Sequence, residues 1–170
     1  MRIKTLNDYD IKSKKVLVRA DLNVPMVNGI VSDNSRIISA IPTIKKIQSL
    51  GGKTIIISHF GRPEGLYKKE LSLQHIIPML EKLLNFPVKF SSEIIGNNVI
   101  NNINKLQNGD VLLLENSRFF PEEEINDENF SKELAKLGDI FCNDAFSASH
   151  RAHASTVGVA KLLPNCAGNL

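Results

Sequence analysis

The feature that most constrains the fold of this chain is a regular alternation between short apolar runs and longer amphipathic stretches. The runs are rich in Val, Ile and Leu and are bounded by Gly, Asn or Asp. They are KVLVRA (15–20), KTIIISH (53–59), VKF (88–90), DVLLLEN (110–116) and DIFCNDAF (139–146). Runs that are apolar on both faces are typical of parallel strands covered by helices on both sides. The sequence therefore predicts buried parallel strands at these places.

The stretches between the runs place apolar residues near the helical period. Helices are predicted within residues 32–51, 71–86, 94–109 and 127–139. Ser72 is predicted to cap the second helix, and Pro42 to kink the first or mark a boundary in it. Gly51, Gly109 and Gly138 are predicted to end the first, third and fourth. Strand–helix alternation over residues 1–170 predicts one α/β domain, a three-layer, Rossmann-like fold with a parallel sheet and helices on both faces.

Composition narrows the class of protein. The 170 residues are 42% hydrophobic and 23% charged, as in a soluble globular domain, and the net charge of +3 implies no broad polyanion-binding surface. Cys142 and Cys166 give neither a disulfide framework nor a CxxC metal pair. No apolar run approaches membrane-spanning length and no signal-peptide core is present. We expect a cytoplasmic protein with neither membrane nor nucleic acid as a partner.

Arginines and lysines are distributed differently along the chain. Four of the six arginines follow predicted strands: Arg36, Arg62, Arg118 and Arg151. The ranges around them, 16–44, 54–67, 106–131 and 137–160, contain no lysine. The carboxyl ends of parallel strands meet at one edge of a sheet, where ligands bind. Because a guanidinium is a planar fork that binds phosphate or carboxylate through two hydrogen bonds, the pattern predicts a site for a small anion.

Other polar residues fall in the same post-strand segments. Asp21 and Asn23 are two residues apart, so in an extended segment both side chains point the same way. Turn formation before Pro25 is the alternative explanation for this pair. His59 is predicted to end the second strand, where a structural hydrogen bond is the alternative to a role in binding.

The segment NDAFSASHRAHAS (143–155) admits three interpretations: a metal site, an acid–base pair or an anion site. A zinc site needs third and fourth ligands that His150 and His153 lack, since the nearby thiol of Cys142 lies in a predicted strand. No metal site is therefore predicted, and Arg151 becomes the candidate ligand. No GxGxxG, Walker A, HExxH or nucleophile-elbow motif is present. The acidic run 122–124 is interpreted as a solvated approach to a helix.

Five segments together resemble the amino-terminal domain of the phosphoglycerate kinase family, and they occur in the family's order. They are KVLVRADLNVP, SDNSRIISAIPTI, SHFGRP, LLENSRFFPEE and NDAFSASHRAHAS, and the resemblance covers essentially the whole chain. It implies a glycolytic kinase that transfers the acyl phosphate of 1,3-bisphosphoglycerate to Mg-ADP, giving 3-phosphoglycerate and ATP. In this family the amino-terminal domain binds the glycerate ligand, the carboxyl-terminal domain binds Mg-ADP or Mg-ATP, and a hinge closes the two.

The resemblance also implies roles for individual residues. Asp21 and Asn23 would hydrogen-bond the glycerate, and Arg36 would stabilise the phosphoryl group in flight, which makes it the catalytic residue. The non-transferred phosphate would be held by His59, Arg62, Arg118 and Arg151. An attacking group that is already anionic needs no proton shuttle, which disfavours an acid–base pair at 150–153.

The chain departs from the family pattern in two ways. Phe120, Ser117, Ser147 and Ser149 replace commoner residues, and tuning of the site is the expected effect. The family's chain is more than twice as long, so we expect a fragment that lacks the nucleotide domain. Such a fragment would hold no cofactor or metal itself, and would bind 3-phosphoglycerate as a monomer without turnover. The rival classes are a non-catalytic anion-binding α/β module, which should carry a Gly-rich loop after the first strand, and a nucleic-acid-binding module.

Overall fold

The computed structural model describes residues 2–145 and 150–169, so Phe146 and the departures at Ser147 and Ser149 lie outside the described residues. Over these ranges the chain forms a six-stranded, wholly parallel sheet in the order β5-β6-β4-β1-β7-β8. The strands are β1 (Lys15–Arg19), β4 (Lys53–Ile57), β5 (Lys89–Ser91), β6 (Val111–Leu114), β7 (Ile140–Asn143) and β8 (Asn165–Ala167).

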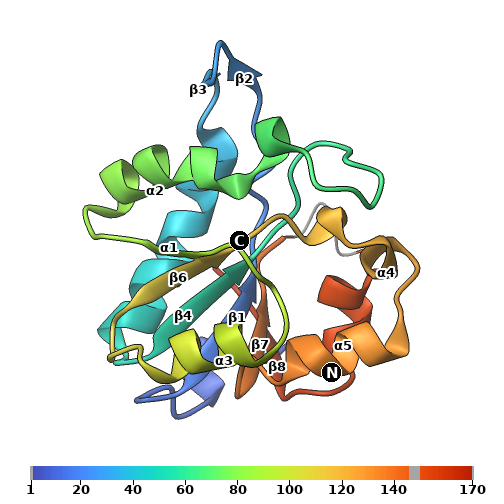
Figure 1. Cartoon of the computed structure of the whole chain (residues 1–170). Helices are drawn as coiled ribbons and strands as arrows, with labels where there is room; N and C mark the ends of the chain where they lie inside the picture. Colours follow the sequence, from blue (N-terminus) through green and yellow to red (C-terminus); the bar gives the residue numbers. More distant parts are fainter. Residues whose placement is uncertain (1, 146–149, 170) are drawn as a thin grey trace.

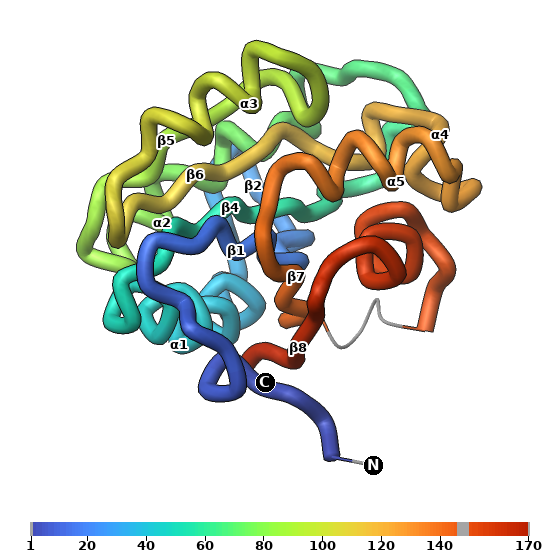
Figure 2. The backbone as a smooth tube through the Cα atoms, turned by 90° about the horizontal axis from the view of Figure 1, so that it is seen from below, coloured from blue at the N-terminus to red at the C-terminus, as the bar shows by residue number. Residues whose placement is uncertain are grey.

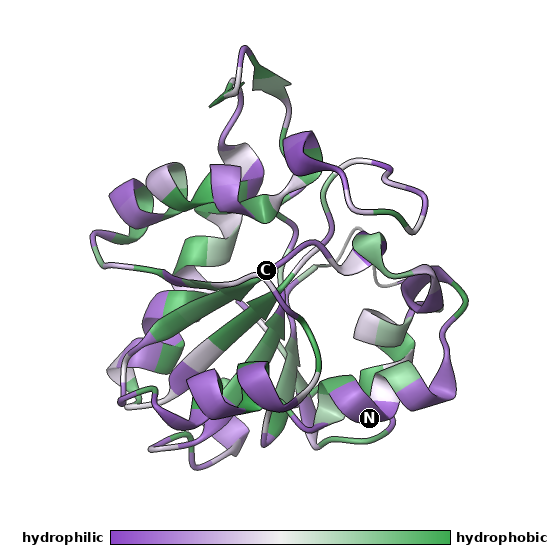
Figure 3. Cartoon of the chain, in the orientation of Figure 1, coloured by the Kyte–Doolittle hydropathy of each residue, from purple (hydrophilic) through white to green (hydrophobic). Residues whose placement is uncertain are grey.

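Helices cover both faces of this sheet (Figure 1). The core on one face joins the sheet to α1 (Ser35–Ser49) and α2 (Ile77–Leu84), and the core on the other face joins it to α3 (Asn97–Asn104) and α5 (Glu128–Ala135). Alternate side chains of β1 point into the two cores: Val16 and Val18 pack in the first, and Leu17 packs in the second. Apolar residues line the strands and the inner faces of the helices (Figure 3). The predicted three-layer α/β fold is confirmed.

The central position of β1 follows from the order in which the chain adds strands. β1 pairs with β4 on one side and with β7 on the other, and Val18 lies opposite both Ile56 and Cys142. The chain builds one half of the sheet first and then crosses to the other side of β1, as the tube in Figure 2 shows. The segments that follow β1, β4, β6 and β7 therefore meet at one edge, where α/β folds bind ligands.

Two short β elements differ from the prediction. Met26–Val27 (β2) and Ile30–Val31 (β3) form an antiparallel hairpin around Asn28 and Gly29, whose φ angles are 51° and 76°. Positive φ at both turn positions is the reason that Asn-Gly favours such hairpins.

The bounds of two strands of the main sheet also differ from the prediction. The edge strand β8 contains no β-branched or aromatic residue, so residue propensities do not predict a strand there. β4 also ends at Ile57, so that His59 lies two residues beyond the strand rather than at its end.

The helix boundaries differ in detail. α1 passes through Pro42 without a boundary, and Gly51 follows it with the left-handed φ of 79° that a terminating glycine adopts. Ser72 accepts a hydrogen bond from the Gln74 N–H as a cap, but of a 3₁₀ turn (Leu73–Ile76) that precedes α2. No helix in the described part of the chain is long and apolar enough to cross a membrane.

Two of the predicted helix ends are wrong. α3 ends at Asn104, and Gly109 lies beyond it in the turn before β6, with φ of 91°. α5 ends at Ala135 with Lys136 as its C-cap. Gly138 has another function: a Cβ there would lie 3.0 Å from the Leu17 Cβ, so its lack of a side chain lets this turn approach β1.

Candidate functional site

A cavity of about 270 Å³ lies at the carboxyl edge of the sheet. Its lining residues come from the segments after β1, β4, β6 and β7 and from the first turn of α1. They are Asp21, Asn23, Arg36, His59, Gly61, Arg62, Arg118 and Arg151. The structure thus brings together all seven residues that the sequence singled out, although they are spread over 130 positions, from 21 to 151.

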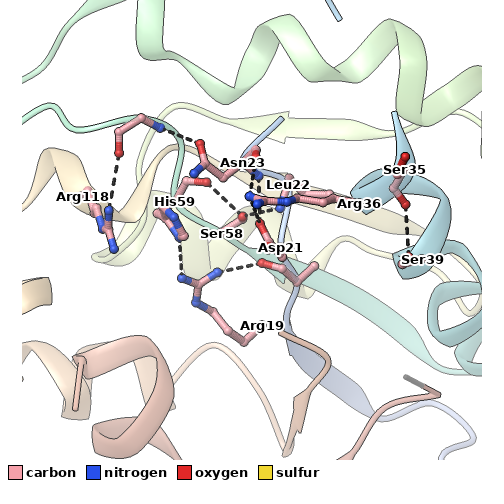
Figure 4. A network of polar contacts seen from close by, with 12 residues as sticks. Arg19, Asp21, Leu22, Asn23, Ser35, Arg36, Ser39, Ser58, His59 and Arg118 are labelled. Carbon is pink, nitrogen blue, oxygen red and sulfur yellow. Dashed lines mark hydrogen bonds and ion pairs between the residues drawn. The ribbon is translucent and has the colours of Figure 1, made fainter. Parts of the chain in front are cut away.

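Hydrogen bonds tie the segment after β1 to the segment after β4 (Figure 4). The Gly61 N–H donates to the Asn23 Oδ1 at 2.9 Å, and the Leu22 N–H donates to the Ser58 Oγ at 3.0 Å. The Asn23 N–H donates in turn to the Asp21 Oδ1 at 3.1 Å. Asp21 and Asn23 therefore both stabilise the wall and line the cavity, so turn formation and ligand binding are compatible roles here.

Arg36 enters the cavity from the first turn of α1. Its Nη1 donates to the Asn23 carbonyl oxygen at 2.7 Å and lies 3.6 Å from the Asp21 Oδ1. About half of the side chain remains exposed. The guanidinium is thus oriented by the opposite wall rather than extended into solvent.

Arg118 is the most buried of the four predicted arginines. It lies in a 3₁₀ turn (Ser117–Phe119) directly after β6 and is 7% exposed. Its Nη1 donates to the Gly61 carbonyl at 3.5 Å, and its Nε lies 3.5 Å from the Glu124 Oε1. Burial lowers the pKa of this guanidinium; the carboxylate of Glu124 opposes this shift, and the positive charges of Arg151 and Arg62 add to it. An arginine stays charged in spite of such a shift.

Asn116 holds the Arg118 turn against the segment after β4. Its side chain accepts from the N–H groups of Phe60 and Arg118, both at 3.1 Å, and donates to the carbonyls of Phe60 and Leu71. Ser117, a departure from the family pattern, donates its N–H to the Ser58 carbonyl at 3.0 Å.

Arg151 is exposed and follows β7 in the sequence. Its carbonyl accepts from the Thr156 Oγ1 at 2.7 Å and from the His153 N–H at 3.0 Å, which fixes the backbone at this point. His153 is buried and His150 is exposed. Among residues 2–145 and 150–169, no group of three or more His, Cys, Asp or Glu side chains comes close enough together to hold a metal ion.

His59 is neutral in this site. Burial lowers the pKa of its imidazole to about 2, and the positive charges of Arg19, Arg118 and Arg151 contribute to the shift. A fifth positive charge is thereby kept out of a cavity that already holds four guanidinium groups. His59 can act there as a hydrogen-bonding group but not as a cation.

Sequence reasoning missed one residue beneath the cavity and misjudged another. Arg19, in β1, is 1% exposed, and its Nη2 lies 2.8 Å from the His59 Nδ1. The interpretation of 122–124 as solvated is wrong for Glu123, which is 1% exposed and accepts from the Ser155 N–H at 2.7 Å. One signal for Arg19 was present: a charged residue inside an apolar run is buried only where it is paired and hydrogen-bonded.

Comparison with known proteins gives a consistent result. The family model described as phosphoglycerate kinase matches residues 6–170. Phosphoglycerate kinase of Ruegeria sp. strain TM1040 is 51% identical over 167 residues, which are 98% of this chain and 42% of the relative. Phosphoglycerate kinase of Borreliella afzelii is 48% identical over 171 residues, and the match covers all of this chain and 44% of that relative.

Solved structures agree with the sequence comparison. The structure of phosphoglycerate kinase from Coxiella burnetii superposes with a TM-score of 0.89 at 38% identity, over 99% of this chain and 42% of that one. The structure of phosphoglycerate kinase from Pyrococcus horikoshii gives a TM-score of 0.88 at 32% identity, over 96% of this chain and 42% of that one. This chain spans about 42% of the length of these relatives and corresponds to their amino-terminal part. The chain belongs to the phosphoglycerate kinase family.

Proposed function

We propose that this chain is the phosphoglycerate-binding domain of a phosphoglycerate kinase, and that the cavity binds 3-phosphoglycerate or 1,3-bisphosphoglycerate. The observation that carries this proposal is the convergence of four arginines, each from a different segment, on one cavity of about 270 Å³. Asp21 is the one acidic residue among those that line it. Such a concentration of positive charge is favourable only when an anion compensates it.

The roles proposed for the lining residues are those that the family resemblance implies, and their convergence on one cavity supports them. The phosphate that is not transferred is bound by His59, Arg62, Arg118 and Arg151. Asp21 and Asn23, which share a wall, hydrogen-bond the hydroxyl and carboxyl region of the glycerate. Arg36, whose guanidinium donates to the Asn23 carbonyl, stabilises the phosphoryl group as it is transferred.

In the whole protein, the reaction is the reversible transfer of a phosphoryl group between 1,3-bisphosphoglycerate and Mg-ADP. Phosphoryl transfer depends on positioning and charge neutralisation rather than on a covalent nucleophile. The residues of this chain orient the glycerate ligand and neutralise its charge, and the nucleotide is bound by a further domain. Closure of the two domains excludes water, which would otherwise hydrolyse the acyl phosphate. We expect a cytoplasmic monomer, and no turnover by residues 1–170 alone.

Isothermal titration tests the binding proposal. 3-Phosphoglycerate should bind to the chain with an affinity that falls as the salt concentration rises, and glycerate, which lacks the phosphate, should bind far more weakly. Arg62→Lys and Arg151→Lys should each weaken binding at least tenfold, because lysine cannot reproduce the bidentate fork.

Arg2→Lys is the matched control, since Arg2 is exposed and pairs with Asp8 away from the cavity. This variant should bind as the unaltered chain does. Equal binding by all three lysine variants would show that guanidinium geometry is irrelevant. Turnover by the isolated chain in a coupled assay would contradict the proposal that a further domain must bind the nucleotide.

A further inference from the structure

The contact between Arg19 and His59 determines which ring nitrogen of His59 carries its hydrogen. The Arg19 Nη2 lies 2.8 Å from the His59 Nδ1. A guanidinium has only donors, so the Nδ1 must be the acceptor and therefore carries no hydrogen. The hydrogen of the neutral ring is then on Nε2, the ring nitrogen that Arg19 does not engage.

Two further hydrogen bonds hold Arg19 itself in place. Its Nη1 donates to the Ala20 carbonyl at 2.7 Å and its Nε donates to the Ser155 Oγ at 2.9 Å. The Ser155 N–H donates in turn to the buried carboxylate of Glu123 at 2.7 Å. The side chain of Arg19 is 1% exposed and is absent from the lining of the cavity. Its guanidinium thus lies behind His59 and does not reach the space that a ligand would occupy.

We propose that Arg19 is a positioning residue, which fixes His59 as the neutral tautomer with its hydrogen on Nε2. His59 then presents a single N–H donor of fixed direction to an anion in the cavity. This inference rests on the proposed function, because the anion in question is the phosphate of the glycerate ligand. Figure 4 shows the guanidinium of Arg19 directed at the imidazole of His59.

The surroundings of His59 favour the same state. Arg19 of β1, Arg118 of the turn after β6, and Arg151 and His153 of the segment after β7 all disfavour a positive charge on the ring. Asp21 is the carboxylate that shares the cavity with it. Protonation of Nδ1 would also place an N–H against the N–H of Arg19. The positive charge of the site thus comes from arginines, and His59 contributes a neutral N–H donor of fixed orientation.

The first test measures the tautomer directly. In ¹⁵N-histidine spectra of the unaltered chain without ligand, the Nδ1 of His59 should resonate as an unprotonated nitrogen and the Nε2 as a protonated one. This pattern should persist from about pH 8 to about pH 5, across the ordinary histidine pKa. A hydrogen on Nδ1, or titration of the ring near pH 6.5, would overturn the proposal. This measurement needs no variant and no ligand.

Variants then test whether Arg19 is the cause. In Arg19→Met the ring should lose its fixed tautomer and its pKa should rise, whereas Arg19→Lys, which keeps a donor, should retain the Nε2–H form. Arg62→Met is the matched control: it removes a guanidinium that lines the same cavity, and it should leave the His59 tautomer unchanged. If Arg62→Met shifts the tautomer as much as Arg19→Met does, general charge rather than the contact is responsible.

A double-mutant cycle with 3-phosphoglycerate separates a positioning role from direct binding. Arg19→Met alone should weaken binding about tenfold, the effect of a lost hydrogen bond to a charged group. In a His59→Phe background the same change should alter affinity by less than about twofold. Additive effects would mean that Arg19 contacts the ligand itself and would overturn the proposal. Failure of the unaltered chain to bind 3-phosphoglycerate would instead refute the proposed function, while the tautomer measurement would stand on its own.

Discussion

At the scale of single residues, the site is built on buried charge that is partly balanced below the cavity. Arg19 and Glu123 are each 1% exposed and are linked through Ser155, and the Glu123 charge opposes the burial that lowers the Arg19 pKa. Removing one member of a buried charged group costs far more than removing a surface charge, since the other member stays buried without compensation. The polar layer under the cavity is therefore a requirement for the stability of the fold.

The neutral His59 predicts a loss of stability in mild acid. Its pKa is about 2 in the folded chain and about 6.5 in the unfolded chain, so below pH 6.5 the unfolded state takes up the proton first. The free energy of unfolding should fall by up to about 1.4 kcal/mol for each pH unit below 6.5, and the contribution is fully present above it. Urea unfolding at about pH 7 and pH 5.5 measures this slope.

His59→Gln is the variant that isolates the effect, because glutamine does not titrate. Its slope should be smaller by the His59 contribution. Part of the slope should remain in the variant, because burial also lowers the pKa of His153. An identical slope in both proteins would contradict the assignment to His59.

The sequence predicted the cavity residues better than the residues behind them. Arg36, Arg62, Arg118 and Arg151 follow strands, and the rule that post-strand segments meet at one edge was sufficient to group them. Arg19 lies within a strand, where its role depends on a partner 40 positions away and on Ser155, 136 positions away. No local pattern encodes such a contact. The burial of Glu123 likewise depends on how α4 (Pro121–Glu124) packs against the segment after β7.

At the scale of elements, buried side chains add to the backbone hydrogen bonds that join the segments around the cavity. The amide of Asn116, fully buried after β6, spans three segments through four hydrogen bonds. The segments after β1 and β4 are joined by Asn23 and Ser58 in the same way. The turn that carries Arg118 consequently depends for its position on the Asn116 amide and its contacts with the segment after β4.

Asn116→Ala should therefore destabilise the chain and loosen the site together. The change leaves the buried N–H groups of Phe60 and Arg118 without their acceptor, at a cost of about 2–4 kcal/mol. Binding of 3-phosphoglycerate should weaken because Arg118 loses its support. Urea unfolding and titration measure the two effects.

Asn108→Ala is the matched control for this change. Asn108 is exposed and donates a single hydrogen bond to the Ser13 Oγ. Its replacement should change stability by less than about 1 kcal/mol and leave binding unaltered. A comparable loss in both variants would show that Asn116 is not the link between segments.

The π-helical turn Ala154–Gly158 makes a second prediction at this scale. A Cβ on Gly158 would lie 2.6 Å from the Asn126 Oδ1 and 2.9 Å from the Ser131 Cβ of α5. Gly158→Ala should destabilise the chain by about 1–3 kcal/mol through overpacking, measured by thermal unfolding. Adding Ser131→Gly should recover part of this loss, because it removes one of the two obstructing side chains. If Ser131→Gly recovers none of the lost stability, the overpacking in Gly158→Ala does not involve Ser131.

At the scale of the whole molecule, the sheet acts as a frame that holds four separate segments at one edge. The alternation of short apolar runs with amphipathic stretches was enough to predict this frame, because buried parallel strands need apolar residues on both faces. Element ends were predicted less well: α1 continues through Pro42, and Gly138 accommodates Leu17 rather than ending α5. Such details depend on tertiary contacts, which periodicity does not encode.

Ligand binding should stabilise this frame as a unit. At a 3-phosphoglycerate concentration of 100 times the Kd, the free energy of unfolding should rise by about 2.7 kcal/mol. For a domain of this size that corresponds to an increase in Tm of roughly 5–10 °C. Thermal unfolding with and without ligand measures the shift, and glycerate at the same concentration serves as the control. No shift at saturation would mean that the ligand does not prefer the folded chain.

The central position of β1 also has a consequence for the order of synthesis. The ribosome makes β1 early, but the neighbour on one of its edges, β7, comes from residues 140–143, about 120 positions later. Until that segment emerges, one edge of this central strand has no partner, and Arg19 has no Ser155 to bind. A nascent chain at that stage exposes an apolar sheet edge next to uncompensated positive charge, a state prone to wrong association. The wall of the cavity that carries Arg151 is thus completed only after the segment that follows β7 has been made and has packed against β1.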